Sequence, residues 1–98
     1  MTTAAKVEAT PNGYRITGSI DIYNATEVAE QLGTAPKASP VMDLTGLDFL
    51  DSSGLAVIVN FAERVDNDIT LVVQPGGAVH RLVNLVALPY RLELRSGS

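Results

Sequence analysis

Apolar and polar residues alternate at the start of the chain. Residues 6–9 are interpreted as a short weak strand, and residues 14–20 alternate between apolar and polar side chains, which predicts a second strand. Residues 10–13 between them have the composition of a tight turn, because Pro11 fixes one backbone angle and Gly13 tolerates a positive φ. The chain is therefore predicted to open with an antiparallel hairpin.

A helical spacing of apolar residues follows the hairpin. The apolar side chains of residues 25–32 recur every three or four positions. Asn24 and Glu27 stand three residues apart, as in a capping box, where each side chain accepts a hydrogen bond from the other residue's backbone. Gly33 suits a helix exit. We expect a helix over these residues and a short loop over residues 34–39.

The middle of the chain contains one ambiguous segment. Residues 41–44 are predicted to form a third strand, and residues 47–50 lead into Asp51-Ser52-Ser53-Gly54. Residues 55–59 are rich in β-branched side chains and would suit a buried strand. We predict a helix over residues 55–65 instead, because serines precede it where a cap belongs and because its apolar face is longer than a typical strand. That face consists of Leu55, Ile58, Val59, Ala62 and Val65.

The last third of the chain repeats the order of strand, helix and strand. Turn residues separate the apolar segments, and Pro89 is expected to end the helix. The predicted elements are a turn at 66–68, a strand at 69–73, a turn at 75–77, a helix whose apolar face is Val79, Leu82, Val83 and Val86, and a strand at 90–95.

These elements predict the fold class. Strands separated by helices imply right-handed crossovers and a parallel sheet, and the opening hairpin adds an antiparallel partner. We therefore expect a single α/β domain over residues 1–98, with a mixed sheet of about five strands packed against helices. The composition, 46% hydrophobic in 98 residues, allows one modest core. Residues 96–98 are expected to be a flexible end.

The absence of cysteine restricts both chemistry and location. It removes disulfides, thiolate metal sites and cysteine nucleophiles together, and it fits a reducing cytoplasm. Residues 1–7 lack the basic start and apolar run of a signal peptide. No apolar run approaches the roughly 20 residues of a membrane span. We expect a cytoplasmic protein that does not insert into a membrane.

The charge is unevenly distributed along the chain. The net charge is −4, and residues 42–68 hold six acidic side chains against one basic side chain. Nucleic acid is excluded as the expected partner, because binding to phosphates needs clustered lysine and arginine. A basic protein surface is a better candidate, although an acidic segment is more often a solvated face.

Catalytic and cofactor motifs are weak. Ser52, His80 and an aspartate could form a triad, but the Gly-x-Ser-x-Gly elbow is absent and a lone histidine is more often a surface residue. Residues 75–77 precede a helix without the Lys-Ser/Thr pair of a phosphate loop, so they are interpreted as a turn. No spacing of His, Asp or Glu suggests a metal. The sequence predicts neither an enzyme nor a cofactor.

Three segments together resemble a known family. Asp51-Ser52-Ser53-Gly54, between a strand and an apolar helix, resembles the signature of anti-sigma factor antagonists, the bacterial branch of STAS domains. Gly18-Ser19-Ile20-Asp21 resembles the family's Gly-Glu-Leu-Asp, and Val41-Met42-Asp43-Leu44 resembles its Val-Asp-Leu stretch. The resemblance covers nearly the whole chain and implies a STAS-like fold. The chain departs from the family at residues 66–68, where relatives often have glycine, and in lacking a final helix.

The resemblance implies a switch. Ser52 matches the serine that an anti-sigma factor, itself a kinase, phosphorylates. The unmodified form binds the anti-sigma factor and frees the sigma factor, and the phosphorylated form releases it. A phosphoserine phosphatase is a further expected partner. Asp21, Asp51, Ser53 and Gly54 match positions around the site, and Gly54 is expected to leave room for a partner's backbone.

Three alternatives stay open at this point. Ser52 and Ser53 would be worth about 1 kcal/mol as simple helix caps. STAS-like domains also serve membrane transport complexes, where the same surface would dock on an ATPase. A third alternative is a stress-scaffold component that assembles through this face.

Overall fold

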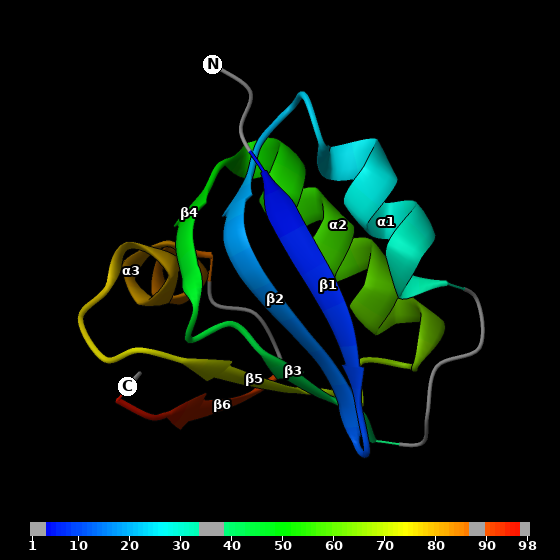
Figure 1. Cartoon of the computed structure of the whole chain (residues 1–98). Coiled ribbons are helices and arrows are strands. Elements are labelled where there is room, and N and C mark those ends of the chain that lie inside the picture. The colour runs from blue at the N-terminus through cyan, green and yellow to red at the C-terminus, as the bar shows by residue number, and fades with distance from the viewer. Residues whose placement is uncertain (1–3, 34–38, 87–89, 97–98) are drawn as a thin grey trace.

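The structure, a computed structural model, describes residues 4–33, 39–86 and 90–96. Within these residues the chain forms six strands and three helices (Figure 1). In chain order they are β1 (Ala5–Thr10), β2 (Gly13–Ile20), α1 (Ala25–Leu32), β3 (Val41–Asp43), β4 (Leu47–Leu50), α2 (Ser52–Arg64), β5 (Thr70–Val73), α3 (Ala78–Leu85) and β6 (Arg91–Leu94).

The strands form one mixed sheet. β1 and β2 make the predicted antiparallel hairpin, and every other pair of neighbouring strands is parallel. The order is β1-β2-β3-β5-β6, while β4 pairs with the second half of β2, beyond the end of β3. The predicted α/β class and the mixed sheet are confirmed, with six strands in place of about five.

The additional strand is β4, which the sequence pattern did not reveal. Leu47 and Leu50 are buried while the two residues between them are exposed, so the period of two is broken. A bulge causes this break, because the adjacent residues Gly18 and Ser19 of β2 pair with Leu47 and Phe49 of β4. The bulge adds one residue to β4 and hides the alternation that identifies a strand.

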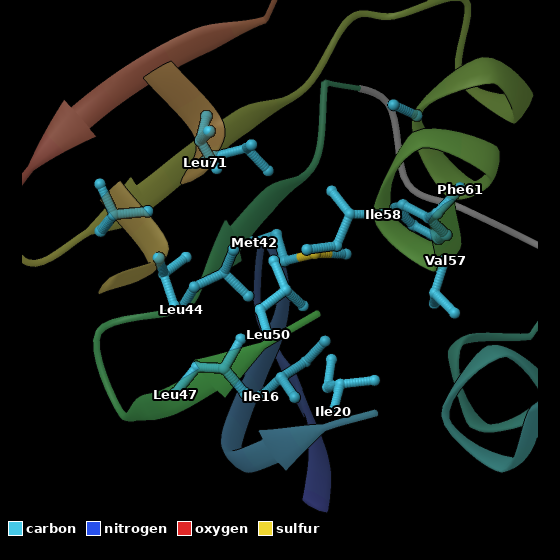
Figure 2. Packing of buried hydrophobic residues seen from close by; sticks show 14 of the residues in the cluster. Ile16, Ile20, Met42, Leu44, Leu47, Leu50, Val57, Ile58, Phe61 and Leu71 are labelled. Atoms are coloured by element: carbon cyan, nitrogen blue, oxygen red, sulfur yellow. The ribbon is translucent and has the colours of Figure 1, made fainter. Parts of the chain in front are cut away.

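Helices α1 and α2 cover one face of the sheet, and the core lies between these layers (Figure 1). Figure 2 shows side chains from β2, β3 and β4 pointing toward Ile58 and Phe61 of α2. The Phe61 ring also meets the Tyr14 ring edge-on, with 5.7 Å between centroids. The side chains with almost no exposed surface include Ile16, Ile20, Leu32, Met42, Leu44, Ile58, Phe61, Ile69, Leu71 and Val73.

α2 is the helix predicted over residues 55–65, and the alternative strand at residues 55–59 is wrong. It begins three residues earlier, at Ser52, and buries a wider arc than expected. Val57 and Phe61 are buried although the predicted face did not contain them, while Leu55 and Val59 of that face are only half-buried. The wider arc arises because α2 contacts both the sheet and α1.

α3 also differs from its predicted extent. Val79 and Val83 are buried as expected, but Val86 is 41% exposed because the helix ends at Leu85 and Val86 follows it. Its expected place in the core is therefore wrong. The expected stop at Pro89 lies outside the described residues, as do residues 34–38 of the expected loop and residues 97–98 of the expected flexible end.

Glycine is needed at Gly13 and at Gly33 for two different structural reasons. Gly33 follows α1 with a φ of 71°, which confirms the predicted helix exit. Gly13, expected to supply a positive φ, instead belongs to β2 and is buried. A Cβ there would lie 1.9 Å from the carbonyl oxygen of Val41, so close pairing with β3 requires this glycine.

Candidate functional site

Asp51 caps the start of α2. Its backbone is extended, and its Oδ1 accepts a hydrogen bond of 3.0 Å from the backbone N–H of Gly54. Its carbonyl oxygen accepts the next bond, from Leu55, at 2.9 Å. The expectation that serines occupy the cap position is wrong, because an aspartate one residue earlier reaches the same orphan donor.

Ser52 and Ser53 are therefore the first two residues inside the helix. Ser52 is exposed and Ser53 is half-buried. Within the described part of the chain, neither hydroxyl makes a hydrogen bond. The Ser52 hydroxyl is thus presented at the surface on a helix whose cap is supplied by its neighbour.

Gly54 fixes how closely α2 approaches the sheet. It is buried, and a Cβ would lie 2.5 Å from Leu50 Cδ1 and 2.9 Å from Ile20 Cβ. The space beside Gly54 is filled by the protein's own strands, so it does not leave room for a partner's backbone as expected. Its effect on the site is to set the depth at which Asp51 and Ser52 sit.

Asp21 and Asp51 follow the ends of two adjacent parallel strands. Ile20 at the end of β2 pairs with Leu50 at the end of β4, and the Asp51 N–H donates to the Ile20 carbonyl at 3.3 Å. Because β2 and β4 run parallel and end side by side, the two aspartates lie together at the carboxyl ends of these strands. Asp48, three residues before Asp51 within β4, is exposed, while Asp21 and Asp51 are half-buried.

The turn after Asp21 is held by side chains. Asp21 Oδ1 accepts from the Tyr23 N–H at 2.9 Å. Asn24 is buried; its Oδ1 accepts from the Asp21 N–H at 2.9 Å and its Nδ2 donates to the Ser19 carbonyl at 2.9 Å. The predicted capping box is wrong, since the Asn24 side chain binds the end of β2 and does not cap α1. Residue 22 completes the turn.

This turn exposes two large side chains that the sequence analysis did not single out. Ile22 is 70% exposed and Tyr23 is 86% exposed. The available signal was position, because both stand between Asp21 and Asn24, outside every predicted periodic element. Exposed tyrosines on a fixed turn are typical of protein-binding surfaces.

Other candidate chemistry is not assembled here. His80 Nδ1 accepts from the Gly76 N–H at 2.9 Å, and the other ring nitrogen lies 2.9 Å from the Asn84 amide nitrogen. Among the described residues, no hydrogen bond joins His80 to Ser52, so the triad alternative has no geometric support. No group of three or more His, Cys, Asp or Glu side chains in the same residues is placed to hold a metal ion.

A polar cavity of about 440 Å³ lies away from the serines. Asp43 forms part of its wall, on the face of the sheet opposite α2, and is largely buried. Burial opposes the charge of Asp43, but two hydrogen bonds from Thr45 and the neighbouring Arg15 outweigh it and lower the pKa below 3.8. This cluster stabilises the sheet and is separate from the start of α2.

Comparison with known proteins agrees with this architecture. A family model described as STAS domain matches residues 4–95. A crystal structure of an anti-sigma factor antagonist from Mycobacterium paratuberculosis is similar with a TM-score of 0.72 and 23% identity, over 94% of this chain and 86% of that one. An uncharacterized protein of the DUF3478 family with a SpoIIAA-like fold, from Shewanella loihica, is similar with a TM-score of 0.54 and 13% identity, over 98% and 87%. None of the helices among the described residues could span a membrane.

Proposed function

The chain belongs to the STAS domain family, and we propose that it is an anti-sigma factor antagonist switched by phosphorylation of Ser52. In this proposal the unmodified protein binds an anti-sigma factor, which is also a serine kinase, and so releases the sigma factor. Phosphate transfer to Ser52 ends the complex, and a phosphoserine phosphatase restores the binding form. The protein is then a substrate and a binding partner in the cytoplasm, and has no catalytic role of its own.

The observation that carries this proposal is the Ser52 hydroxyl. It is exposed, it begins a helix, and it makes no hydrogen bond among the described residues. A serine that served as the cap would have its oxygen bound to the helix backbone. Because Asp51 has that role, Ser52 is available to a kinase without loss of the cap.

A phosphate at this position is compatible with the folded domain. The backbone N–H groups of Ser52 and Ser53 have no acceptor within the described residues, and the start of a helix carries partial positive charge. Phosphorylation adds a charge of about −1.5 to −2 at pH 7. Beside Asp48 and Asp51 this charge makes the surface repel acidic groups of a partner and raises its cost of desolvation.

The residues around Ser52 have distinct proposed parts. Asp21 and Ser53 belong to the surface that the partner contacts, and Asp51 adds both charge and the helix cap. Gly54 acts indirectly, because its close packing against the strands sets the distance of the two serines from the sheet. Substitution of any one of these four residues around Ser52 should weaken partner binding, each for a different physical reason.

The test begins with partner capture and ends with phosphate transfer. Wild-type protein and Ser52→Asp serve as baits in a lysate of the source organism, and the proteins retained are identified by mass spectrometry. The candidate kinase is then purified and incubated with ATP and the wild type, Ser52→Ala or Ser53→Ala. Intact mass and peptide mapping should show one phosphate on Ser52 in the wild type and in Ser53→Ala, and none in Ser52→Ala.

Affinity measurements complete the test. Ser52→Ala should keep partner binding, and Ser52→Asp should weaken it, although one carboxylate imitates a phosphate poorly. Equal affinity of both variants, or a phosphate on another residue, would contradict the switch. Retention of a transport ATPase by both baits would favour the transport alternative, and large assemblies of the wild type would favour the scaffold.

A further inference from the structure

Among the described residues, β6 is an edge strand whose outer side pairs with no other strand. Its inner side pairs with β5, where the Arg91 N–H donates to Ile69 at 3.2 Å and the Arg95 N–H donates to Val73 at 2.9 Å. Neighbouring residues of a strand direct their backbone groups to opposite sides. Leu92 and Leu94 therefore present their N–H and carbonyl groups away from β5. A strand that adds here would find free donors and acceptors.

The side chains of β6 separate into an apolar and a charged face. Leu92 and Leu94 pair in register with the buried Leu71 and Val73, so they lie on the face that the helices cover. They are nevertheless 37% and 51% exposed. Apolar surface beside an unpaired edge favours the addition of another strand.

The charged face alternates in sign. Arg91, Glu93 and Arg95 lie on the face of the sheet opposite the leucines, and all three are exposed. A run of one sign would repel a second copy of the strand in every register. The alternation in β6 instead allows some registers and opposes others.

We infer that two copies of this chain pair through β6, antiparallel, about a two-fold axis at Leu92. In this register Leu92 lies opposite Leu92 of the second copy, and Leu94 lies opposite Tyr90 of the second copy. Arg91 lies opposite Glu93 of the second copy, and symmetry provides that pair twice. Backbone hydrogen bonds, apolar contacts and opposite charges are therefore satisfied together.

The neighbouring registers are less favourable. An axis at Glu93 places Glu93 opposite itself and Arg91 opposite Arg95, so like charges meet at each position. An axis at Leu94 keeps opposite charges together, but it sets Leu92 against Ser96 and loses an apolar pair. Moving the axis by one residue shifts the pairing by two residues and reverses the electrostatics. The charges therefore exclude the axis at Glu93, and the apolar contacts disfavour the axis at Leu94.

The other edge of the sheet is a poorer candidate. β1 also carries alternating charges, Lys6 and Glu8. Its apolar residues are smaller, and Val7 is half-buried against the core. α1 contacts β1 as well, so pairing there would cover less apolar surface than pairing at β6.

Intrachain ion pairs at β6 are compatible with pairing. Arg91 bonds Asp68 at 2.7 Å and Thr70 at 2.9 Å, and Glu93 pairs with Arg95. Thr70 is half-buried, but the charged side chains are exposed, and exposed ion pairs contribute little by themselves. The charges therefore select the register through repulsion in the wrong one more than through attraction in the right one.

The experiment is sedimentation velocity over a wide range of protein concentrations. The wild type should shift from the monomer mass of 10.4 kDa toward twice that mass as concentration rises. Glu93→Arg and Arg91→Glu should each weaken the dimer by about tenfold or more, because each places like charges opposite one another twice. An equimolar mixture of the two variants should restore the dimer, since their charges complement each other.

Glu30→Arg, which makes the same change of charge on the exposed surface of α1, is the matched control and should leave dimerisation unchanged. Circular dichroism of each variant establishes that it is folded. A wild type that stays at the monomer mass up to about 1 mM, where even a weak interface of this class associates, would overturn the inference. A dimer that tolerates Glu93→Arg, or a mixture that stays monomeric, would overturn it equally. None of these outcomes bears on Ser52.

Discussion

Asp51 caps α2 and Ser52 does not, so substitutions of these two residues should affect stability differently. Asp51→Ala removes the oxygen that accepts from the Gly54 N–H at 3.0 Å. Loss of such a cap costs about 1 kcal/mol, and loss of a negative charge beside the helix start adds about 0.3–1 kcal/mol. The free energy of unfolding should fall by about 1–2 kcal/mol. In a domain of this size that lowers Tm by about 4–8 °C for each kcal/mol.

Ser52→Ala should leave stability unchanged or raise it slightly. The hydroxyl makes no hydrogen bond among the described residues, and alanine favours a helix by about 0.5 kcal/mol over serine. Urea unfolding followed by circular dichroism at pH 7 measures both variants. Asp51→Asn is the matched control, because it keeps an acceptor oxygen and removes only the charge. A loss in Ser52→Ala equal to that in Asp51→Ala would mean that the serine is the cap.

Two further predictions test the surroundings of the site and the opposite face of the sheet. Gly54→Val should destabilise the domain by about 1–3 kcal/mol, because the valine side chain would overlap Leu50 and Ile20. Thermal unfolding measures the loss, and an unchanged Tm would contradict this packing. Asp43→Asn should lower the free energy of unfolding by about 1–2 kcal/mol at pH 7. The pKa of Asp43 is lowered in the folded state by Thr45 and Arg15 in spite of burial, so its contribution is present above the unfolded pKa near 4 and disappears as pH falls through the folded value. Urea unfolding at pH 7 and pH 3 should therefore show the difference narrowing, and a constant difference would refute the assignment.

Regular periodicity made most of the fold predictable from the sequence. The hairpin, three helices and the parallel strands follow from apolar residues recurring at periods of two and between three and four. β4 was missed because its bulge against Gly18 and Ser19 is a property of the pair of strands, and the sequence of one strand does not contain it. Val86 was misplaced because α3 ends at Leu85, one residue before the helical spacing of apolar side chains does.

The site was predictable in position but not in detail. The sequence located Ser52 at the start of a helix, yet Asp, Asn and Ser are all good caps, so composition alone does not say which of several adjacent residues takes that part. The choice depends on how deeply Gly54 packs against Ile20, which is a contact between distant segments. Asn24 is a second example, because its Oδ1, the atom that would cap α1, instead accepts from the backbone N–H of Asp21.

On the proposed function, the same geometry explains how one phosphate changes binding without changing the fold. Asp51 already satisfies the Gly54 N–H, so the N–H groups of Ser52 and Ser53 remain as donors for phosphate oxygens at the same helix end. That attraction is internal and short in range. The net charge of −4 and the six acids within residues 42–68 mean that the added charge enlarges a field that is already negative toward an approaching partner. In this proposal the folded domain tolerates the phosphate at Ser52 while the complex loses affinity, as a reversible binding switch requires.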